Sequence, residues 1–237
     1  MIKSNSVKMI LAILFFSFIA ALTISSVHQK TYQIIKDNEN KAEQASLRNV
    51  LSYGANAKTD TLDGFGEFWR EYDKDGNAIG YAFIGETRGY SGIIRFICGI
   101  DLDGKIKGLS IISQTETPGL GARITEAASG TWFPFRRSED NTPWFGEQFR
   151  GILATKPISI NRTSNEWHKL SASQRDDLLR KNEITLITGS TITVRVIKEE
   201  LSARAQKLMA LLAVNKYSQP NKEPYAEDLT EDETDVQ

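Results

Sequence analysis

Residues 184–213 read ITLITGSTITVRVIKEELSARAQKLMALLA, and this stretch decides how the chain folds. Its apolar start, Ile184 to Ile187, predicts a short strand, and Gly189 supplies the backbone freedom for a tight turn. Beyond the turn, apolar residues recur at helical spacing and define one face: Val194, Ile197, Leu201, Ala205, Leu208 and Leu212. The hydroxyl-rich segment Thr188 to Thr193, TGSTIT, is therefore expected where a helix begins.

TGSTIT fits both a binding role and purely structural roles. Free backbone N–H groups and the positive end of the helix dipole make a helix start suitable for a phosphate. Ser190 or Thr191 also fits an ordinary N-cap, and the β-branched residues of 184–197 fit a β-hairpin. One glycine among hydroxyl residues is a weak motif, so these residues alone favour structure.

Composition limits the classes of function. The 237 residues leave room for one globular domain with appendages, and the net charge of −1 gives no basic field for nucleic acid. The single cysteine, Cys98, excludes an intramolecular disulfide. No Cys/His cluster has metal-ligand spacing, so we expect no metal site, and a redox function would need an organic cofactor.

The N-terminal region carries the strongest physical signal, the uncharged run of 19 residues from Met9 to Val27. A helix of about 20 apolar residues spans a bilayer. The run is long for a secretory signal and lacks a good cleavage site, so we expect an uncleaved transmembrane helix after a cytoplasmic leader at 1–8. Residues 28–53 are expected to form a stalk helix, and the short leader favours an exported domain.

The following segments predict a mostly antiparallel sheet with flanking helices, an α+β fold, over 54–216. Two hairpins are expected around Asp-Gly turns, from 65–72 with 78–86 and from 93–100 with 105–112. A further strand is expected at 151–160 and a helix at 171–180, capped by Ser171 or Ser173. Residues 217–237 are acidic and are expected to be disordered.

Two irregular regions remain. Thr115 to Arg123, TETPGLGAR, is either a connecting loop or a backbone-lined wall against a flat ligand. The region 130–150 is rich in aromatic rings, which fit core packing or a ring-lined pocket: Trp132, Phe133, Phe135, Trp144, Phe145 and Phe149. Arg136 and Arg137 lie among them.

The anchor, the loop ETPGLGAR at 116–123 and TGSTIT occur in an order that resembles one protein family. The chain is similar to the FMN-binding subunits of membrane electron-transport complexes, namely the G subunit of the Rnf complex and the C subunit of the Na⁺-translocating NADH:quinone reductase. The resemblance covers roughly Gly89 to Leu212 and includes GYSGIIRFICGIDLDGKIKGLSIISQTETPGLGARI and WFGEQFRG. The short segment after ETPGLGAR is more like the Rnf protein.

The resemblance implies a covalent FMN, held as a phosphoester on Thr191, with no catalytic residue and no metal ligand. The other cofactor-binding residues that it implies are Glu116, Thr117, Gly119, Leu120, Gly121, Thr188, Gly189 and Ser190. The chain departs from the family motif in two places. Ser190 stands where the family has alanine and is a rival hydroxyl, and Thr185 stands where an acidic residue is usual.

By resemblance, the protein is an electron-carrier subunit of an ion-translocating Rnf-type complex. Expected partners are the flavin and iron–sulfur subunits of that complex, a flavin transferase and the lipid bilayer, but no nucleic acid. The expected location is the inner membrane, with a single span and the domain on the periplasmic side. Alternatives are a carrier like the C subunit of the quinone reductase, an assembly protein of such a complex without flavin, and an exported domain that binds another anion.

Overall fold

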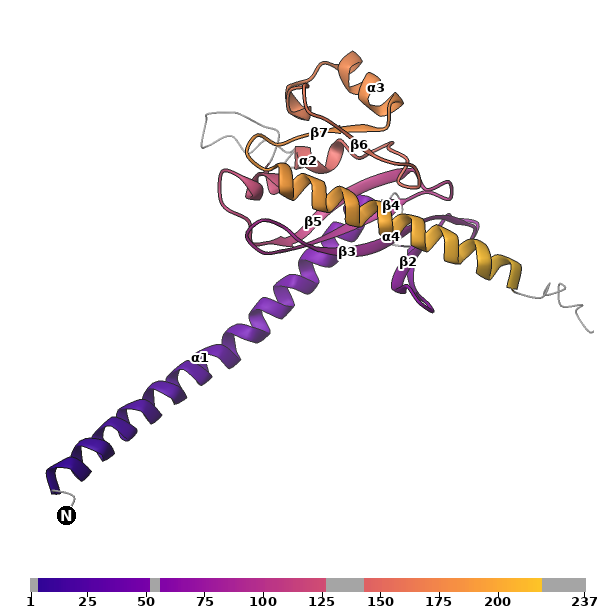
Figure 1. The fold of residues 1–237 in the computed structure, drawn as a ribbon. Helices are drawn as coiled ribbons and strands as arrows, with labels where there is room; N and C mark the ends of the chain where they lie inside the picture. Colours follow the sequence, from indigo (N-terminus) through magenta and orange to yellow (C-terminus); the bar gives the residue numbers. More distant parts are fainter. Residues whose placement is uncertain (1–3, 52–55, 127–142, 219–237) are drawn as a thin grey trace, which may run out of the picture.

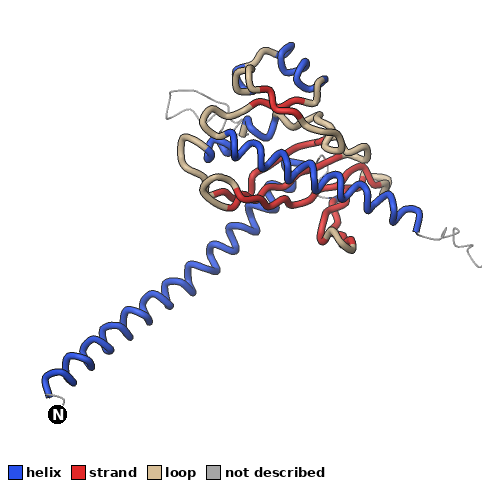
Figure 2. The backbone as a smooth tube through the Cα atoms, viewed as in Figure 1, coloured by secondary structure: helices blue, strands red, loops and turns tan. Residues whose placement is uncertain are grey.

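The centre of the molecule is a five-stranded antiparallel sheet in the order β1-β2-β3-β4-β5. The computed structural model describes residues 4–51, 56–126 and 143–218. Its strands are β1 (Ala57–Leu62), β2 (Gly66–Tyr72), β3 (Ala78–Arg88), β4 (Ile93–Ile100) and β5 (Ile106–Gln114). Helices cover this sheet on both faces, so the α+β class predicted from the sequence is confirmed (Figures 1 and 2).

Both predicted hairpins form, and an aspartate organises each turn. The Asp73 carboxylate accepts the N–H groups of Asp75 at 2.9 Å and Asn77 at 2.8 Å in the β2–β3 turn. The Asp101 carboxylate does the same in the β4–β5 turn, where it accepts the N–H of Lys105 at 2.8 Å. These bonds set the antiparallel register that the Asp-Gly sequences predict.

Strand β4 is buried on both faces because different helices cover them. Its residues Phe96, Cys98 and Ile100 belong to the main core with helix α4 (Thr191–Ser218). The alternate residue Ile97 packs instead with the end of helix α1 (Ser4–Val50). The sheet is thus the middle of three layers.

Helix α4 buries the face that the sequence predicts. Val194, Ile197, Leu201, Ala205 and Leu208 are all fully buried, and Leu212 packs against the same core. The hairpin alternative for 184–197 is wrong, because a continuous helix begins at Thr191 and lies across the sheet (Figure 1).

Helix α1 is one continuous helix of 47 residues that projects far from the sheet (Figure 1). By length and composition its apolar part is able to cross a membrane. Its last turn docks closely on the sheet, since a Cβ at Gly99 would lie 2.4 Å from the Val50 carbonyl oxygen. The absence of side chains at Gly99 and Gly108 lets the helix end approach the strands.

A smaller lobe follows the sheet and includes the last stretch before α4. It contains η2 (Gly121–Thr125), α2 (Trp144–Glu147), β6 (Ser159–Asn161), η3 (Trp167–Lys169), α3 (Ala172–Arg180) and β7 (Glu183–Thr185). Strands β6 and β7 pair in parallel. Ser171 caps α3 in a capping box with Gln174, so of the two predicted caps, Ser171 and Ser173, the first is the one that forms.

Two predicted strands are shorter than expected. In 151–160 only β6 is a strand, because Gly151 has a positive φ of 91° and Pro157 lacks an N–H. The strand expected at Ile184 to Ile187 is β7, which ends at Thr185. Strand β7 stops there because its parallel partner β6 has only three residues with which it can pair. The region expected to be disordered is 217–237, but Tyr217 and Ser218 belong to helix α4, and residues 219–237 lie outside the described residues.

Candidate functional site

A tight turn leads from the lobe into α4 and carries the TGSTIT segment. Ser190 N–H donates to the Ile187 carbonyl at 2.9 Å, and Gly189 has a positive φ of 81°. The Ser190 carbonyl then accepts the first helical bond, from Val194 N–H at 3.2 Å. Glycine is needed here because the left-handed conformation is costly for residues with a side chain. Thr191 becomes the first residue of the helix.

The start of α4 presents unused hydrogen-bond donors. Within the described part of the chain, the N–H groups of Thr191, Ile192 and Thr193 have no acceptor. The Ser190 hydroxyl is buried and has no partner there either, so it does not act as the N-cap acceptor expected from the sequence. Thr191, in contrast, is exposed. This end of the helix is therefore suited to an anion.

The ETPGLGAR loop is folded by its own backbone. Leu120 and Ala122 N–H both donate to the Thr117 carbonyl, at 3.1 and 3.2 Å, and Gly119 has a positive φ of 76°. Glu116 N–H donates to the Gln114 side chain at 2.7 Å. The result is a compact loop that presents Thr117 and Leu120 to solvent.

The Glu116 carboxylate fastens this loop to α4. It is buried, and one oxygen accepts the Thr193 hydroxyl at 2.7 Å. The other oxygen accepts the N–H of Ser91, in the β3–β4 turn, at 2.9 Å. Both oxygens are therefore engaged in bonds within the protein, which indicates that Glu116 shapes the site.

These segments enclose a cavity of about 410 Å³ at the start of α4. It is lined by Tyr90, Glu116, Thr117, Leu120, Gly121, Gly189, Ser190, Thr191, Ile192 and Thr193. The structure thus brings together all the predicted site residues except Thr188 and Gly119, which lie in the same two turns without lining the cavity. The two halves of the predicted site, about 70 residues apart in sequence, form one cavity.

Three lining residues were not predicted. Ile192 and Thr193 are the last two residues of TGSTIT, so the four predicted residues before them were the signal that could have identified them. Tyr90 lies in the GYSG string that contributes to the family resemblance, but its position gave no specific role. Tyr90 is 75% exposed, so its ring presents apolar surface at the cavity.

Glycines allow the walls of the cavity to approach closely. A Cβ at Gly189 would lie 2.7 Å from the Leu120 side chain across the cavity. A Cβ at Gly121 would lie 2.1 Å from a Glu116 carboxylate oxygen, and at Gly89 it would lie 2.4 Å from the other. Side chains at Gly89 and Gly121 would displace the Glu116 carboxylate.

A second buried carboxylate, Glu166, lies behind the turn. It accepts two bonds from Arg123, at 2.7 and 3.0 Å, and one from Thr188 N–H at 3.1 Å. Lys169 lies 2.9 Å away. The Arg123 guanidinium holds the pKa of Glu166 well below its usual range, and burial lowers the pKa of the neighbouring His168. Glu166 is consequently a fixed negative charge at neutral pH.

Thr185, where the family pattern has an acidic residue, is a buried structural hydroxyl. Its hydroxyl and its N–H both donate to the Gln148 side-chain oxygen, at 3.0 and 2.8 Å. It also accepts the N–H of Trp167 at 3.1 Å. Thr185 therefore joins β7 to α2 and η3 and does not line the cavity.

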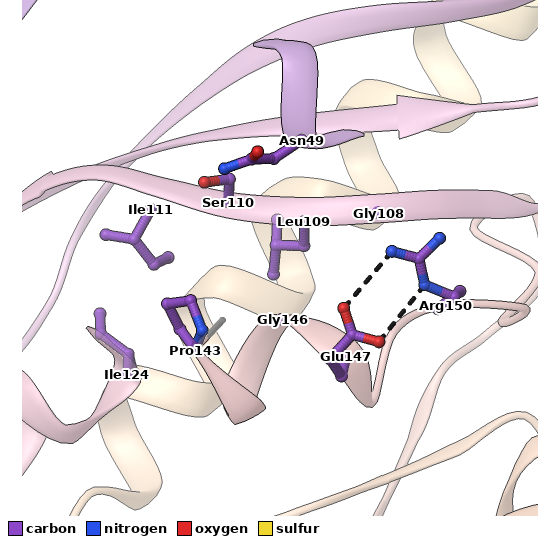
Figure 3. Close-up of a pocket in the computed structure, with 10 residues that line it drawn as sticks. All are labelled: Asn49, Gly108, Leu109, Ser110, Ile111, Ile124, Pro143, Gly146, Glu147 and Arg150. Carbon is purple, nitrogen blue, oxygen red and sulfur yellow. Dashed lines mark hydrogen bonds and ion pairs between the residues drawn. The ribbon is translucent and has the colours of Figure 1, made fainter. Parts of the chain in front are cut away.

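A second cavity, of about 420 Å³, lies away from TGSTIT between β5, η2 and α2 (Figure 3). Its charged residues Glu147 and Arg150 pair with each other at 3.3 Å. Ile111, Ile124 and Pro143 give it an apolar side (Figure 3). Across the described ranges, no group of three or more His, Cys, Asp or Glu side chains is placed to hold a metal ion.

The aromatic residues of the 130–150 region that the structure describes are core residues. Trp144, Phe145 and Phe149 are almost completely buried and line neither cavity. Their packing favours the core alternative over a ring-lined pocket. The remaining predicted residues of this region lie outside the described ranges: Trp132, Phe133, Phe135, Arg136 and Arg137.

Comparison with known proteins adds a family match. Residues 89–203 match the model of the FMN-binding domain family. This range begins just before Tyr90 and includes both the ETPGLGAR loop and TGSTIT. The cavity at the start of α4 is therefore built entirely from the matched segment.

Similar proteins come from bacteria and archaea. The chain is 33% identical over 134 residues to the G subunit of the Na⁺-translocating ferredoxin:NAD⁺ oxidoreductase complex of Acetobacterium woodii, covering 56% of this chain and 50% of that protein. It is 27% identical to the G subunit of the ion-translocating oxidoreductase complex of Methanosarcina acetivorans, covering 86% of this chain and 94% of that one. The chain spans about half the length of the first curated relatives that it matches.

Solved structures also align with much of the chain, and one of them is described here. It is the C subunit of the Na⁺-translocating NADH-quinone reductase from Parabacteroides distasonis, with a TM-score of 0.46 and 18% identity. The alignment covers 77% of this chain and 96% of that chain.

Proposed function

Because residues 89–203 match the FMN-binding domain family, we propose that the protein is a membrane-anchored electron carrier with FMN held as a phosphoester on Thr191. We place it in an Rnf-type ion-translocating complex, because its relatives include the G subunits of ion-translocating oxidoreductase complexes. The observation that carries the proposal is the environment of Thr191. This residue is exposed, lines the cavity and begins a helix whose first N–H groups are free within the described part of the chain.

The described residues fit an FMN. The N–H groups of Thr191, Ile192 and Thr193 offer donors to the phosphate, and the dipole of α4 favours its negative charge. The absence of a side chain at Gly189 lets the Leu120 side chain approach this turn. When bound, FMN supplies a conjugated ring that accepts and releases electrons. The role of this chain is then to hold the ring and set its surroundings.

The rim of the cavity suits the ring of the cofactor. Tyr90, Leu120 and Ile192 are 75%, 45% and 40% exposed and line the same cavity. Apolar surface of this kind favours contact with a planar conjugated system, and an aromatic side chain adds stacking. A ring resting here would keep an exposed edge, as exchange of electrons with partner proteins requires.

The structure distinguishes the two adjacent hydroxyls at the attachment site. Thr191 is exposed, whereas Ser190 is only 4% exposed. Attachment would join the Thr191 Oγ to the flavin phosphorus of an activated phosphoanhydride donor, whose leaving group departs as the hydroxyl loses its proton. A transferase must reach the hydroxyl for this reaction. We therefore propose Thr191 over Ser190.

Membrane anchorage completes the proposal. We assign the span to 9–27 and the cytoplasmic leader to 1–8, with the domain on the exported side. The stalk is the part of α1 that follows the span, and it ends at Val50, not at residue 53 as expected from the sequence. The partners are then the other flavin and iron–sulfur subunits of the complex and the transferase that attaches FMN. The length and apolar character of α1 support an anchor.

Flavin fluorescence in a denaturing gel tests the covalent bond. The full chain purified from its native host should fluoresce after SDS denaturation, and the TGSTIT peptide should carry the added mass of FMN. Thr191→Val should abolish both signals, whereas the matched variant Ser190→Ala should keep them. A dark wild type would favour an assembly protein without flavin. Fluorescence that persists in Thr191→Val would move the attachment to another residue.

A further inference from the structure

Little in the structure holds the turn that presents Thr191. Thr188 and Gly189 are exposed, and the turn is closed by the bond from Ser190 N–H to the Ile187 carbonyl. Among the described residues, Glu166 makes the side-chain hydrogen bond to the backbone of 188–190, through Thr188 N–H at 3.1 Å. The position of this turn therefore depends strongly on Glu166.

Glu166 is itself held rigidly. It is only 4% exposed, and the next residue, Trp167, donates its N–H to the buried Thr185 hydroxyl at 3.1 Å. Arg123 makes a bidentate contact with the carboxylate, which is a strong and directional form of ion pair. The carboxylate that receives Thr188 N–H thus has little freedom to move.

Arg123 connects this carboxylate to the other wall of the cavity. It belongs to η2, which starts at Gly121, and Gly121 lines the cavity beside Leu120. Glu166 therefore bridges the 116–123 loop and the 188–190 turn. Glu116, which lines the cavity, makes a second bridge from the 116–123 loop to α4 through the Thr193 hydroxyl at 2.7 Å. Two buried carboxylates, Glu116 and Glu166, therefore link the 116–123 loop to the 188–193 segment.

We propose that Glu166 is a positioning residue that fixes the Thr188–Ser190 turn against the 116–123 loop and so sets the place of the Thr191 hydroxyl for flavin attachment. This inference rests on the proposed function. A charged acceptor is required because Arg123 and Lys169 both contact the carboxylate. An uncharged side chain at 166 would weaken the hold of Arg123, and the loop and the turn would then separate more often.

The test compares Glu166→Gln with Glu147→Gln in the full chain, in detergent micelles and with the transferase of the native host. Glu147 is the control, because it also pairs with an arginine but is more exposed and lines the other cavity (Figure 3). Loss of a charge-assisted hydrogen bond should speed amide hydrogen exchange at Thr188 about tenfold. The fraction of chain carrying covalent flavin, read by intact mass, should fall by about the same factor. Glu147→Gln should leave both values unchanged.

Arg123→Lys provides a second variant, which keeps the positive charge but cannot form the bidentate pair with Glu166. It should give an intermediate yield, with an unfolding midpoint between those of the wild type and Glu166→Gln. Faster exchange in Glu166→Gln with an unchanged flavin yield would reduce Glu166 to a structural role and overturn the inference. Unchanged exchange would overturn it as well. A wild type without covalent flavin would overturn the proposed function and this inference together, whereas a flavinylated wild type with a normal Glu166→Gln yield would overturn this inference alone.

Discussion

Hydroxyl groups at the start of α4 have sharply different surroundings. Ser190 and Thr193 are buried, whereas Thr191 between them is exposed. The Thr193 hydroxyl donates to Glu116 at 2.7 Å, but the Ser190 hydroxyl has no partner among the described residues. One hydroxyl is therefore structural and one is accessible, and the third is buried at a cost. Residue type alone could not separate these roles.

This difference predicts opposite effects for two conservative substitutions. Thr193→Val keeps the shape but leaves a buried Glu116 oxygen without its donor, and we expect a loss of about 1–3 kcal/mol in the free energy of unfolding. Ser190→Ala removes a hydroxyl without a partner among the described residues, and its unfolding free energy should stay the same or rise. Denaturant unfolding of the full chain in detergent measures both. Equal losses in the two variants would contradict the assigned roles.

Packing of the elements follows from the alternation of side chains along β4. Phe96, Cys98 and Ile100 contribute to the core under α4, whereas Ile97 packs with the end of α1. Gly99 and Gly108 are direct partners across β4 and β5, and Val50 lies against both. Because neither glycine has a side chain, the last turn of α1 packs directly on the backbones of β4 and β5. The long helix is thereby joined to the sheet through close backbone contact.

Alanine at Gly99 and at Gly108 should lower the stability of the fold by different amounts. A Cβ at Gly99 would lie 2.4 Å from the Val50 carbonyl oxygen, whereas one at Gly108 would lie 3.1 Å from the Val50 Cα. Backbone atoms cannot rotate away, so Gly99→Ala should destabilise the fold by about 1–3 kcal/mol. Gly108→Ala should cost less. Thermal unfolding of the two variants measures which loss is larger. A larger loss in Gly108→Ala would show that the last turn of α1 does not pack on this glycine pair.

The elements differ in how much of them the sequence predicts. The hairpins and the buried face of α4 follow from local signals, namely Asp-Gly turns and a 3.6-residue period. Strand β1, AKTDTL, was not predicted because an edge strand with polar residues has no clear alternation of burial. Strand β7 is short because its length depends on β6. Pairing between distant segments is a property of the fold that local patterns do not encode.

The candidate site shows the same limit. ETPGLGAR and TGSTIT are visible as irregular segments, and the family resemblance joins them. Glu166 carries no sequence signal, since it lies 22 residues before Thr188 in a stretch without a motif. Its role depends on the path of the chain through η3, which brings it behind the turn.

The whole molecule combines a compact domain with a long projecting helix. Helix α1 has 47 residues, which corresponds to about 70 Å at 1.5 Å per residue. The part beyond the proposed span at 9–27 continues without interruption to the sheet. A helix of this kind would hold the flavin domain at a set distance from the bilayer, in contrast to a flexible linker. The side of the membrane is then the main determinant of which partners the flavin meets.

The single cysteine makes that side measurable. Cys98 is fully buried, and burial raises the pKa of its thiol, so it should not react in the folded chain. Asn38→Cys introduces an exposed thiol on α1 between the proposed span and the domain. Ser6→Cys introduces a thiol on the other side of the proposed span. We expect a membrane-impermeant maleimide to label Asn38→Cys in intact spheroplasts, and Ser6→Cys only after permeabilisation.

Each pattern of labelling has a distinct meaning because the wild-type chain supplies an unlabelled background. Labelling of Ser6→Cys alone in intact spheroplasts would place the flavin domain in the cytoplasm and contradict the proposed orientation. Labelling of both positions would show that 9–27 does not cross the bilayer. Labelling of the wild type itself would mean that Cys98 is accessible, and the buried position of β4 between α1 and α4 would then be wrong. The orientation is therefore tested independently of flavin attachment.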